Sequence, residues 1–370
     1  MSAKEVWVLL SIYSLIVAAF IVVIVSSASS QSKTTKLEKF ELVAGQPLRF
    51  HLLGDFGELD PYEKIYNEYP VQVVAQRMVA NAYVRPISMI ITTGDNRYPK
   101  PDSKFDQVIY KYLYHIFNKG GLQSKPWFLV LGNHDCSSNP QYEIDATSLY
   151  PMWHLPRKFY NFTIEIDNKY LAAFIFMNGC SLAHDINKVG DLEQYEWLEK
   201  ILKDLNRNPR VKWILVNIHE PPFSAGIHHG DNEPIKKFIL PLLFKYNVDI
   251  LMTGHEHNMQ YFISRYSNDT MPPYEPLPNS TFNCSKEEFV PYNRESFWIK
   301  GQGLHEIVQG AGGAELYELC PNKTTEMADL VYGNVQFGFS EVYIDSTMIS
   351  VDYYAIDEGD PVYSLKIYAK

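Results

Sequence analysis

Two histidines flank a single glutamate at the end of an apolar segment, in the stretch Leu251–Gln260, which reads LMTGHEHNMQ. Side chains at positions i and i+2 of an extended chain point to the same face. If the strand direction continues beyond Gly254, His255 and His257 converge on one point just past the end of the strand. Imidazole is a common metal ligand, so this spacing predicts a metal site.

The same pattern, an apolar strand followed by a side chain that can bind a metal, occurs five times. Leu48–Leu53 precedes Gly54-Asp55, Ile87–Thr93 precedes Gly94-Asp95, Trp127–Leu131 precedes Gly132-Asn133-His134-Asp135, Val211–Ile218 precedes His219, and Val248–Thr253 precedes Gly254-His255-Glu256-His257. Near-continuous apolar strands are typical of a sheet that is buried on both faces. In α/β folds, ligands bind beyond the carboxyl ends of the strands, and all five candidate segments lie there.

Helices are expected between these strands, because apolar residues recur there with a spacing near 3.6. The predicted helices are Val71–Tyr83, Lys104–Phe117 and Gln194–Asn206. Strand–helix alternation predicts an α/β fold. Later strands are expected to form the second sheet of a sandwich, at Leu304–Gln309, Phe337–Ile344, Met348–Ile356 and Val362–Tyr368.

The candidate ligands offer oxygen and nitrogen atoms but no cysteine sulfur. They are Asp55, Asp95, Tyr98, Asn133, His219, His255 and His257. This set is too large for one zinc ion and fits two metals that share a carboxylate. Two metals about 3.5–4 Å apart can hold a phosphoryl group and an attacking hydroxide together.

Five motifs in this order resemble the signatures of the calcineurin-like metallophosphoesterases: GDFG, GDNRY, GNHD, a strand that ends in a single histidine, and GHEHN. Tyr98, three residues after Asp95, narrows the resemblance to the purple acid phosphatases. The compact length and the QGAGG run at Gln309–Gly313 resemble the tartrate-resistant, mammalian-type branch. The resemblance covers roughly Leu48 to Gly313. It implies the metallophosphoesterase fold, a four-layer α/β/β/α sandwich of two mixed β-sheets flanked by helices.

The resemblance also implies how the ligands divide between the metals. Fe(III) would be held by Asp55, Asp95, Tyr98 and His257. A divalent metal (Fe, Zn or Mn) would be held by the shared Asp95 with Asn133, His219 and His255. Charge supports this division, since hard anionic oxygen suits the more highly charged ion. The implied enzyme is an acid phosphatase that hydrolyses phosphomonoesters, either small molecules or phosphoproteins, with a hydroxide activated at the dinuclear centre.

Three further residues are expected near the reacting phosphate. His134 resembles the family's substrate-side histidine, which stabilises the transferring phosphoryl group or protonates the leaving alkoxide. Asp135 would orient a ligand or His134. The spacing allows either His228 or His229 to fill a second histidine position, and we favour His229, before Gly230.

Two segments depart from the family pattern. Arg97 stands where the branch usually carries an apolar or aromatic residue, and it either reaches the phosphate or lies at the surface. The strand Leu171–Asn178 ends in NGCSL, where relatives often show an Asp-Thr pair. This strand is expected to neighbour the one before Asn133, which favours a disulfide between Cys136 and Cys180. The second disulfide would then join Cys284 and Cys320, although four cysteines allow three connectivities.

The amino-terminal segment and the sequons indicate the secretory pathway. Val6–Val25 is long enough for one membrane span, so residues 1–30 are either a cleaved signal peptide or an uncleaved anchor. The remaining chain would be secreted, lumenal in a lysosome or vacuole, or membrane-anchored with a lumenal or extracellular domain. A linker at 31–46 would precede a catalytic domain at 47–370 with a glycosylated insertion at 264–295. Glycosylation is expected at Asn161, Asn268, Asn279, Asn283 and Asn322.

The formal charge of −10 argues against a nucleic-acid partner. Two other functions stay open from the sequence. One is a membrane-anchored scaffold that keeps the phosphatase fold and binds partner proteins, as relatives in apicomplexan parasites do when they anchor a motor complex. The other is a phosphodiesterase with two divalent metals, in which Tyr98 would not be a ligand.

Overall fold

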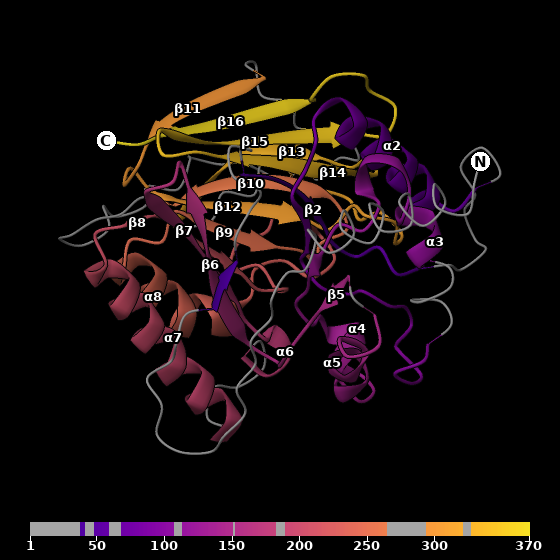
Figure 1. Ribbon diagram of the computed structural model, residues 1–370, viewed down its shortest axis with the longest axis horizontal. Helices are drawn as coiled ribbons and strands as arrows, with labels where there is room; N and C mark the ends of the chain where they lie inside the picture. The colour runs from indigo at the N-terminus through magenta and orange to yellow at the C-terminus, as the bar shows by residue number, and fades with distance from the viewer. Residues whose placement is uncertain are drawn as a thin grey trace, which may run out of the picture.

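Two mixed β-sheets packed face to face form the centre of the molecule in a computed structural model (Figure 1). The structure describes residues 38–40, 48–58, 68–106, 113–150, 152–182, 189–264, 294–320 and 327–370. The first sheet has the strand order β1 (Glu38–Phe40), β6 (Tyr160–Ile166), β7 (Tyr170–Phe176), β8 (Val211–Asn217), β9 (Ile250–Thr253), β12 (Leu304–Gln309), β10 (Met259–Ser264), β13 (Ala328–Asn334). The second has the order β11 (Glu295–Ile299), β16 (Tyr363–Tyr368), β15 (Met348–Ala355), β14 (Gly338–Ile344), β2 (Leu48–Leu53), β3 (Met89–Thr92), β4 (Trp127–Phe128), β5 (Trp153–His154).

Helices cover the outer faces of the two sheets. Figure 1 shows α7 (Val189–Arg207) and α8 (Leu240–Lys245) on one side of the strands, with α2 (Pro70–Val84) and α3 (Tyr114–Phe117) on the other. The short elements are η2 (Gly120–Leu122), α4 (Asn133–Cys136), α5 (Gln141–Ala146), α6 (Gly179–Leu182) and η3 (Ile235–Ile239). The predicted four-layer α/β/β/α sandwich is thus confirmed.

Alternation along β2 shows how one strand contacts two layers. The Phe50 ring packs against Phe174 of the opposite sheet, with ring centroids 5.7 Å apart. His51 points the other way and lies 2.9 Å from Asn81 of α2. Because side chains alternate along a strand, an apolar run such as LRFHLL can bury both faces. Leu198 and Leu202 of α7 pack in a separate apolar layer on the first sheet.

The distribution of strands between the sheets differs from the sequence prediction. Strand β12 was expected in the second sheet, but it pairs in parallel with β9 in the first. Strands β2, β3 and β4 pair in parallel in the second sheet, while β8 and β9 pair in parallel in the first. The five predicted ligand segments therefore come from both sheets. Strand β1, inside the predicted linker, pairs with β6.

The helix predicted at Lys104–Phe117 is only partly present. Residues 101–106 form turns, residues 107–112 are outside the described part, and the helix α3 covers Tyr114–Phe117. The carboxylate of Asp106 explains the turn, because it accepts hydrogen bonds from the Asp102 amide and from Arg97 Nε, at 3.2 Å each. The prediction of helix from Lys104 is therefore wrong.

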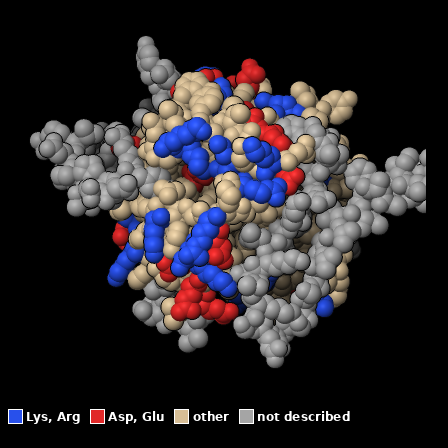
Figure 2. Space-filling model, turned by 60° about the vertical axis from the view of Figure 1, so that its left-hand side comes forward, with Lys and Arg blue, Asp and Glu red and all other residues tan. Residues whose placement is uncertain are grey.

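The face that lies to the left in Figure 1 carries side chains of both charges. Figure 2 shows Lys and Arg interspersed with Asp and Glu on this face. Ion pairs of exposed described residues include Lys245 with Glu199, at 2.6 Å. The net negative charge of the chain therefore does not make its surface uniformly acidic.

Candidate metal centre

Three of the predicted ligands lie two or three residues after the end of a strand, each in a left-handed backbone conformation. Asp55 follows β2, Asp95 follows β3 and His255 follows β9, with φ values of 56°, 50° and 68°. This region is sparsely populated by residues other than glycine and costs about 1–3 kcal/mol for each residue held there. The strand direction does not continue through His255, because β9 ends at Thr253 and the chain turns sharply.

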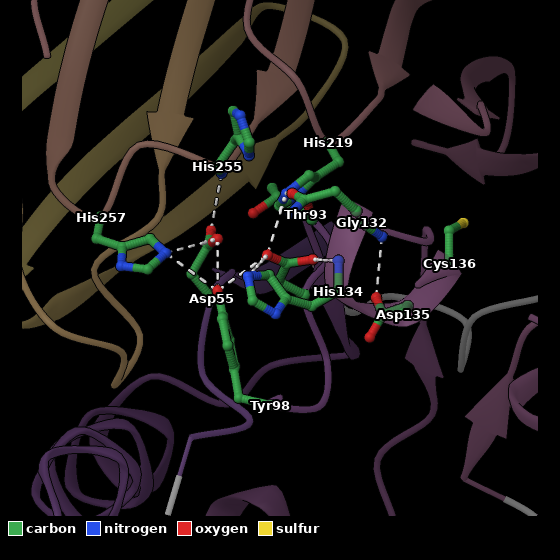
Figure 3. Close-up of polar contacts among 12 residues, drawn as sticks. Asp55, Thr93, Tyr98, Gly132, His134, Asp135, Cys136, His219, His255 and His257 are labelled. Carbon is green, nitrogen blue, oxygen red and sulfur yellow. Dashed lines mark hydrogen bonds and ion pairs between the residues drawn. The ribbon is translucent and has the colours of Figure 1, made fainter. Parts of the chain in front are cut away.

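One group of polar atoms surrounds the hydroxyl of Tyr98 (Figure 3). The Tyr98 oxygen lies 3.1 Å from Asp55 Oδ1, 3.0 Å from Asp95 Oδ2 and 3.0 Å from His257 Nε2. Asp55, Asp95 and His257 each offer a ligand atom, and these atoms lie within 4.8 Å of one another. All four side chains are buried.

A second group shares Asp95 with the first. Asp95, His219 and His255 also offer ligand atoms within 4.8 Å of one another. His219 Nε2 lies 3.4 Å from Asp95 Oδ2 and 3.1 Å from Asn133 Oδ1. Asp95 therefore belongs to both groups, as expected of a carboxylate between two metals. His255 and His257 of one short segment belong to different groups.

Backbone carbonyls fix the orientation of two imidazole rings. His219 Nδ1 lies 2.7 Å from the Thr93 carbonyl, and His257 Nδ1 lies 2.6 Å from the Glu315 carbonyl. A proton on each Nδ1 donates to the carbonyl and leaves the lone pair on Nε2. Metal-binding histidines are commonly held in this way.

The electrostatics of the two groups favour a positive charge between them. Burial and the charges of Asp95 and Asp55 raise the pKa of Tyr98 well above its ordinary value. Burial opposes ionisation of Asp95, but the charge of His219 outweighs it and holds the pKa of Asp95 below its ordinary value. Burial and the charge of His219 lower the pKa of His255, which keeps this imidazole neutral. Burial opposes protonation of His219 and His257, but the carboxylates of Asp95 and Asp55 outweigh it and raise the pKa of both rings, so a bound cation would displace protons there.

Asp135 holds the loops that carry several of the predicted ligands. Its carboxylate accepts hydrogen bonds from the backbone amides of Asn96, at 3.0 Å, Gly132, at 2.9 Å, and Arg97, at 3.2 Å. Asp135 thus links the loop after β3 to the loop after β4. A glycine is needed at 132, because a Cβ there would lie 2.1 Å from Asp95 Oδ1.

His134 lies beside the first group, with its ring packed on Tyr98 at a centroid distance of 4.3 Å. Its Nδ1 is 2.8 Å from the Pro99 carbonyl, and its Nε2 is 4.0 Å from Asp95 Oδ2. The guanidinium of Arg97 is held by the buried Asp106. Arg97 therefore does not simply lie at the surface, and its contact with a phosphate stays a prediction.

Stacked rings bring both loop histidines close to the centre. His229 stacks on His255, with ring centroids 3.9 Å apart. His228 stacks on Tyr317 at 4.1 Å, and Tyr317 stacks on His257 at 4.0 Å. His229 thus contacts a predicted ligand directly, whereas His228 is one ring further away. Tyr317 has no sequence signal and was not predicted.

The structure contains the disulfide between Cys136 and Cys180. The reason given for it from the sequence is wrong, because β4 and β7 belong to different sheets. The short helices α4 and α6, which follow these strands, meet across the sandwich and carry the two cysteines. Cys284 lies outside the described residues, so its pairing with Cys320 stays a prediction.

Comparison with known proteins identifies the family. The model of the calcineurin-like phosphoesterase family matches residues 48–259. The chain belongs to the calcineurin-like phosphoesterase family. It is 28% identical to tartrate-resistant acid phosphatase type 5 of Oryctolagus cuniculus over 233 residues, which are 58% of this chain and 68% of the relative. With acid phosphatases as relatives, this phosphoesterase is a phosphatase hydrolase, and the predicted resemblance to purple acid phosphatases is confirmed.

Two solved structures share the fold of this phosphoesterase. GAP50, the anchor in the inner membrane complex of Plasmodium, superposes with a TM-score of 0.66 at 19% identity, over 87% of this chain and 89% of its own. The purple acid phosphatase PPD1 of yellow lupin (Lupinus luteus) superposes with a TM-score of 0.63 at 18% identity, over 88% of this chain and 54% of its own.

Most of the residues expected to carry glycans or to attach the chain to a membrane lie outside the part of the chain that the structure describes. Asn161 lies within β6 and its side chain is buried, which argues against a glycan there in the folded phosphoesterase. The other four sequons lie outside the described residues. No helix in the described part of the chain is long and apolar enough to cross a membrane, and Val6–Val25 is not part of it.

Proposed function

We propose that this phosphoesterase is an acid phosphatase that hydrolyses phosphomonoesters at a dinuclear centre of Fe(III) and a divalent metal. The observation that carries the proposal is the pair of ligand groups that share Asp95. The first group combines two carboxylates with the phenol of Tyr98, which would bind Fe(III) as the phenolate after losing its proton, and such hard anionic oxygens suit Fe(III). The second adds only neutral donors to Asp95 and suits Fe, Zn or Mn in the divalent state.

The proposed Fe(III) ligands are Asp55, Asp95, Tyr98 and His257, and the proposed ligands of the divalent metal are Asp95, Asn133, His219 and His255. When bound, the two cations would polarise the phosphoryl group and lower the pKa of a water molecule that attacks it. The Thr93 and Glu315 carbonyls would keep the Nε2 lone pairs of His219 and His257 available for binding.

We propose that His134 supplies the proton that the leaving group needs. Its Nδ1–H donates to the Pro99 carbonyl, and its Nε2 lies on the side of Asp95. A protonated Nε2 can donate to the leaving alkoxide of a bound phosphomonoester. His229, stacked on His255, is positioned to contact the same substrate from the opposite loop.

The test is hydrolysis of an aryl phosphate at about pH 5 by the purified full chain. Asp95→Asn removes a carboxylate from both ligand groups and should lower kcat by about 10³-fold or more. Asp249→Asn is the matched control, since Asp249 is also a buried carboxylate but pairs with Lys300 away from the centre. Activity of Asp95→Asn equal to that of the control would refute the two-metal assignment.

A scaffold role is the second candidate, because GAP50, described as an anchor of the inner membrane complex, superposes over most of both chains. Membrane attachment would then rest on Val6–Val25, and the domain at 47–370 would bind a partner protein in the secretory pathway. Turnover of the aryl phosphate by the wild-type chain favours the enzyme. Full metal occupancy without turnover would favour the scaffold.

A further inference from the structure

Glu256, between the two histidines of GHEHN, points into the loop after β8. Its side chain is fully buried. Its Oε1 accepts hydrogen bonds from the backbone amides of His229, at 3.1 Å, and Gly230, at 2.7 Å. The neighbours on either side of Glu256 belong to the metal centre, so one turn of chain contacts both the centre and this loop.

The loop packs closely around the carboxylate. A Cβ at Gly226 would lie 1.9 Å from Glu256 Oε2, so only glycine allows the backbone to approach this far. The Gly226 amide donates to Ser224 Oγ at 2.8 Å. Backbone atoms of the loop therefore lie against both oxygens of the Glu256 carboxylate.

The outer side of the same loop is held by the segment before Cys320. The Ile227 amide donates to the Glu318 carbonyl at 3.1 Å, and the Cys320 amide donates to the Ala225 carbonyl at 2.7 Å. These two hydrogen bonds fix residues 225 and 227, and neither of them involves His229. The amide of His229 is fixed instead by Glu256.

We propose that Glu256 is a positioning residue that acts through this loop to hold His229 against the metal centre. The two hydrogen bonds set the backbone of His229 and Gly230, and the ring of His229 then stacks on His255. A side-chain oxygen suits this task because a single acceptor, Oε1, takes both convergent amides. The proposal rests on the proposed function, in which His229 contacts the substrate.

A double-mutant cycle tests whether Glu256 acts through His229. We expect Glu256→Ala to lower kcat/KM for an aryl phosphate by about 10- to 100-fold, because a small displacement of a positioned group is costly. In a His229→Ala background, the same substitution should change kcat/KM by less than about two-fold. Glu256→Gln keeps an oxygen acceptor and should restore most of the activity. Equal losses in the two backgrounds would overturn the proposal.

Two further measurements separate this proposal from the proposed function. Hydrogen exchange of residues 224–231 should be faster in Glu256→Ala, with unchanged metal content. Asp249→Ala is the control, since Asp249 precedes β9, accepts the Ile214 amide at 2.9 Å and lies at the other end of the strand. It should leave exchange in the loop unchanged. If the wild-type chain shows no turnover, the proposed function fails, while unchanged exchange or lost metal in Glu256→Ala overturns the role of Glu256.

Discussion

Removal of the disulfide between Cys136 and Cys180 should destabilise both the fold and the proposed divalent metal site. The two cysteines are 44 residues apart in the sequence. In the chain-entropy model, a cross-link over about this length removes about 13 cal/mol/K from the unfolded chain, or about 4 kcal/mol at 25 °C. Cys136 ends the helix α4, which begins with Asn133, so the free helix should hold Asn133 less firmly.

Urea unfolding followed by tryptophan fluorescence measures the first effect. Cys136→Ser/Cys180→Ser should lower the free energy of unfolding by about 4 kcal/mol. Each single substitution breaks the same cross-link and should give nearly the same loss. Titration with the divalent metal should show weaker binding, whereas iron content should be kept. A loss below about 1 kcal/mol, or a large difference between the single variants, would refute the reasoning.

Two more predictions concern the pH dependence of stability and the substitution of Gly132. Burial lowers the pKa of both His51 and His305 to about 3, so between about pH 6.5 and 3 the unfolded chain binds protons that the native chain does not. Stability should therefore fall with falling pH, by about 2 kcal/mol for each histidine between pH 7 and pH 5. In urea titrations, His51→Asn/His305→Gln should show a weaker dependence on pH, and an unchanged dependence would contradict the assignment. Gly132→Ala would bring a Cβ to 2.1 Å from Asp95 Oδ1 and should lower kcat by about 100-fold with little change in circular dichroism; full activity would show that Asp95 tolerates displacement.

Local patterns were sufficient to predict much of the fold. The strands β2 at Leu48–Leu53 and β12 at Leu304–Gln309 have the predicted bounds, because an apolar run between polar turns defines them. The helix α2 differs from its prediction by one residue at each end. Most candidate ligands could be found because they follow such a strand, whereas Tyr98 has no such signal and gained weight from the family resemblance.

Contacts between distant segments could not be predicted in the same way. An apolar run looks alike in either sheet, so nothing in the sequence separates β12 from β14. The turn at residues 101–106 depends on the ion pair of Arg97 with Asp106, which overrides helical spacing. The contact of Glu256 with His229 joins residues 27 positions apart, for which no periodicity exists.

Elemental analysis of the purified full chain, with Asp95→Asn beside it, tests the central claim most directly. The two ligand groups that share Asp95 lead us to expect two metal ions per wild-type chain, one of them iron, and loss of both in the variant. A fully active wild-type chain with fewer than two ions, or an Asp95→Asn variant that keeps both, would contradict the dinuclear centre.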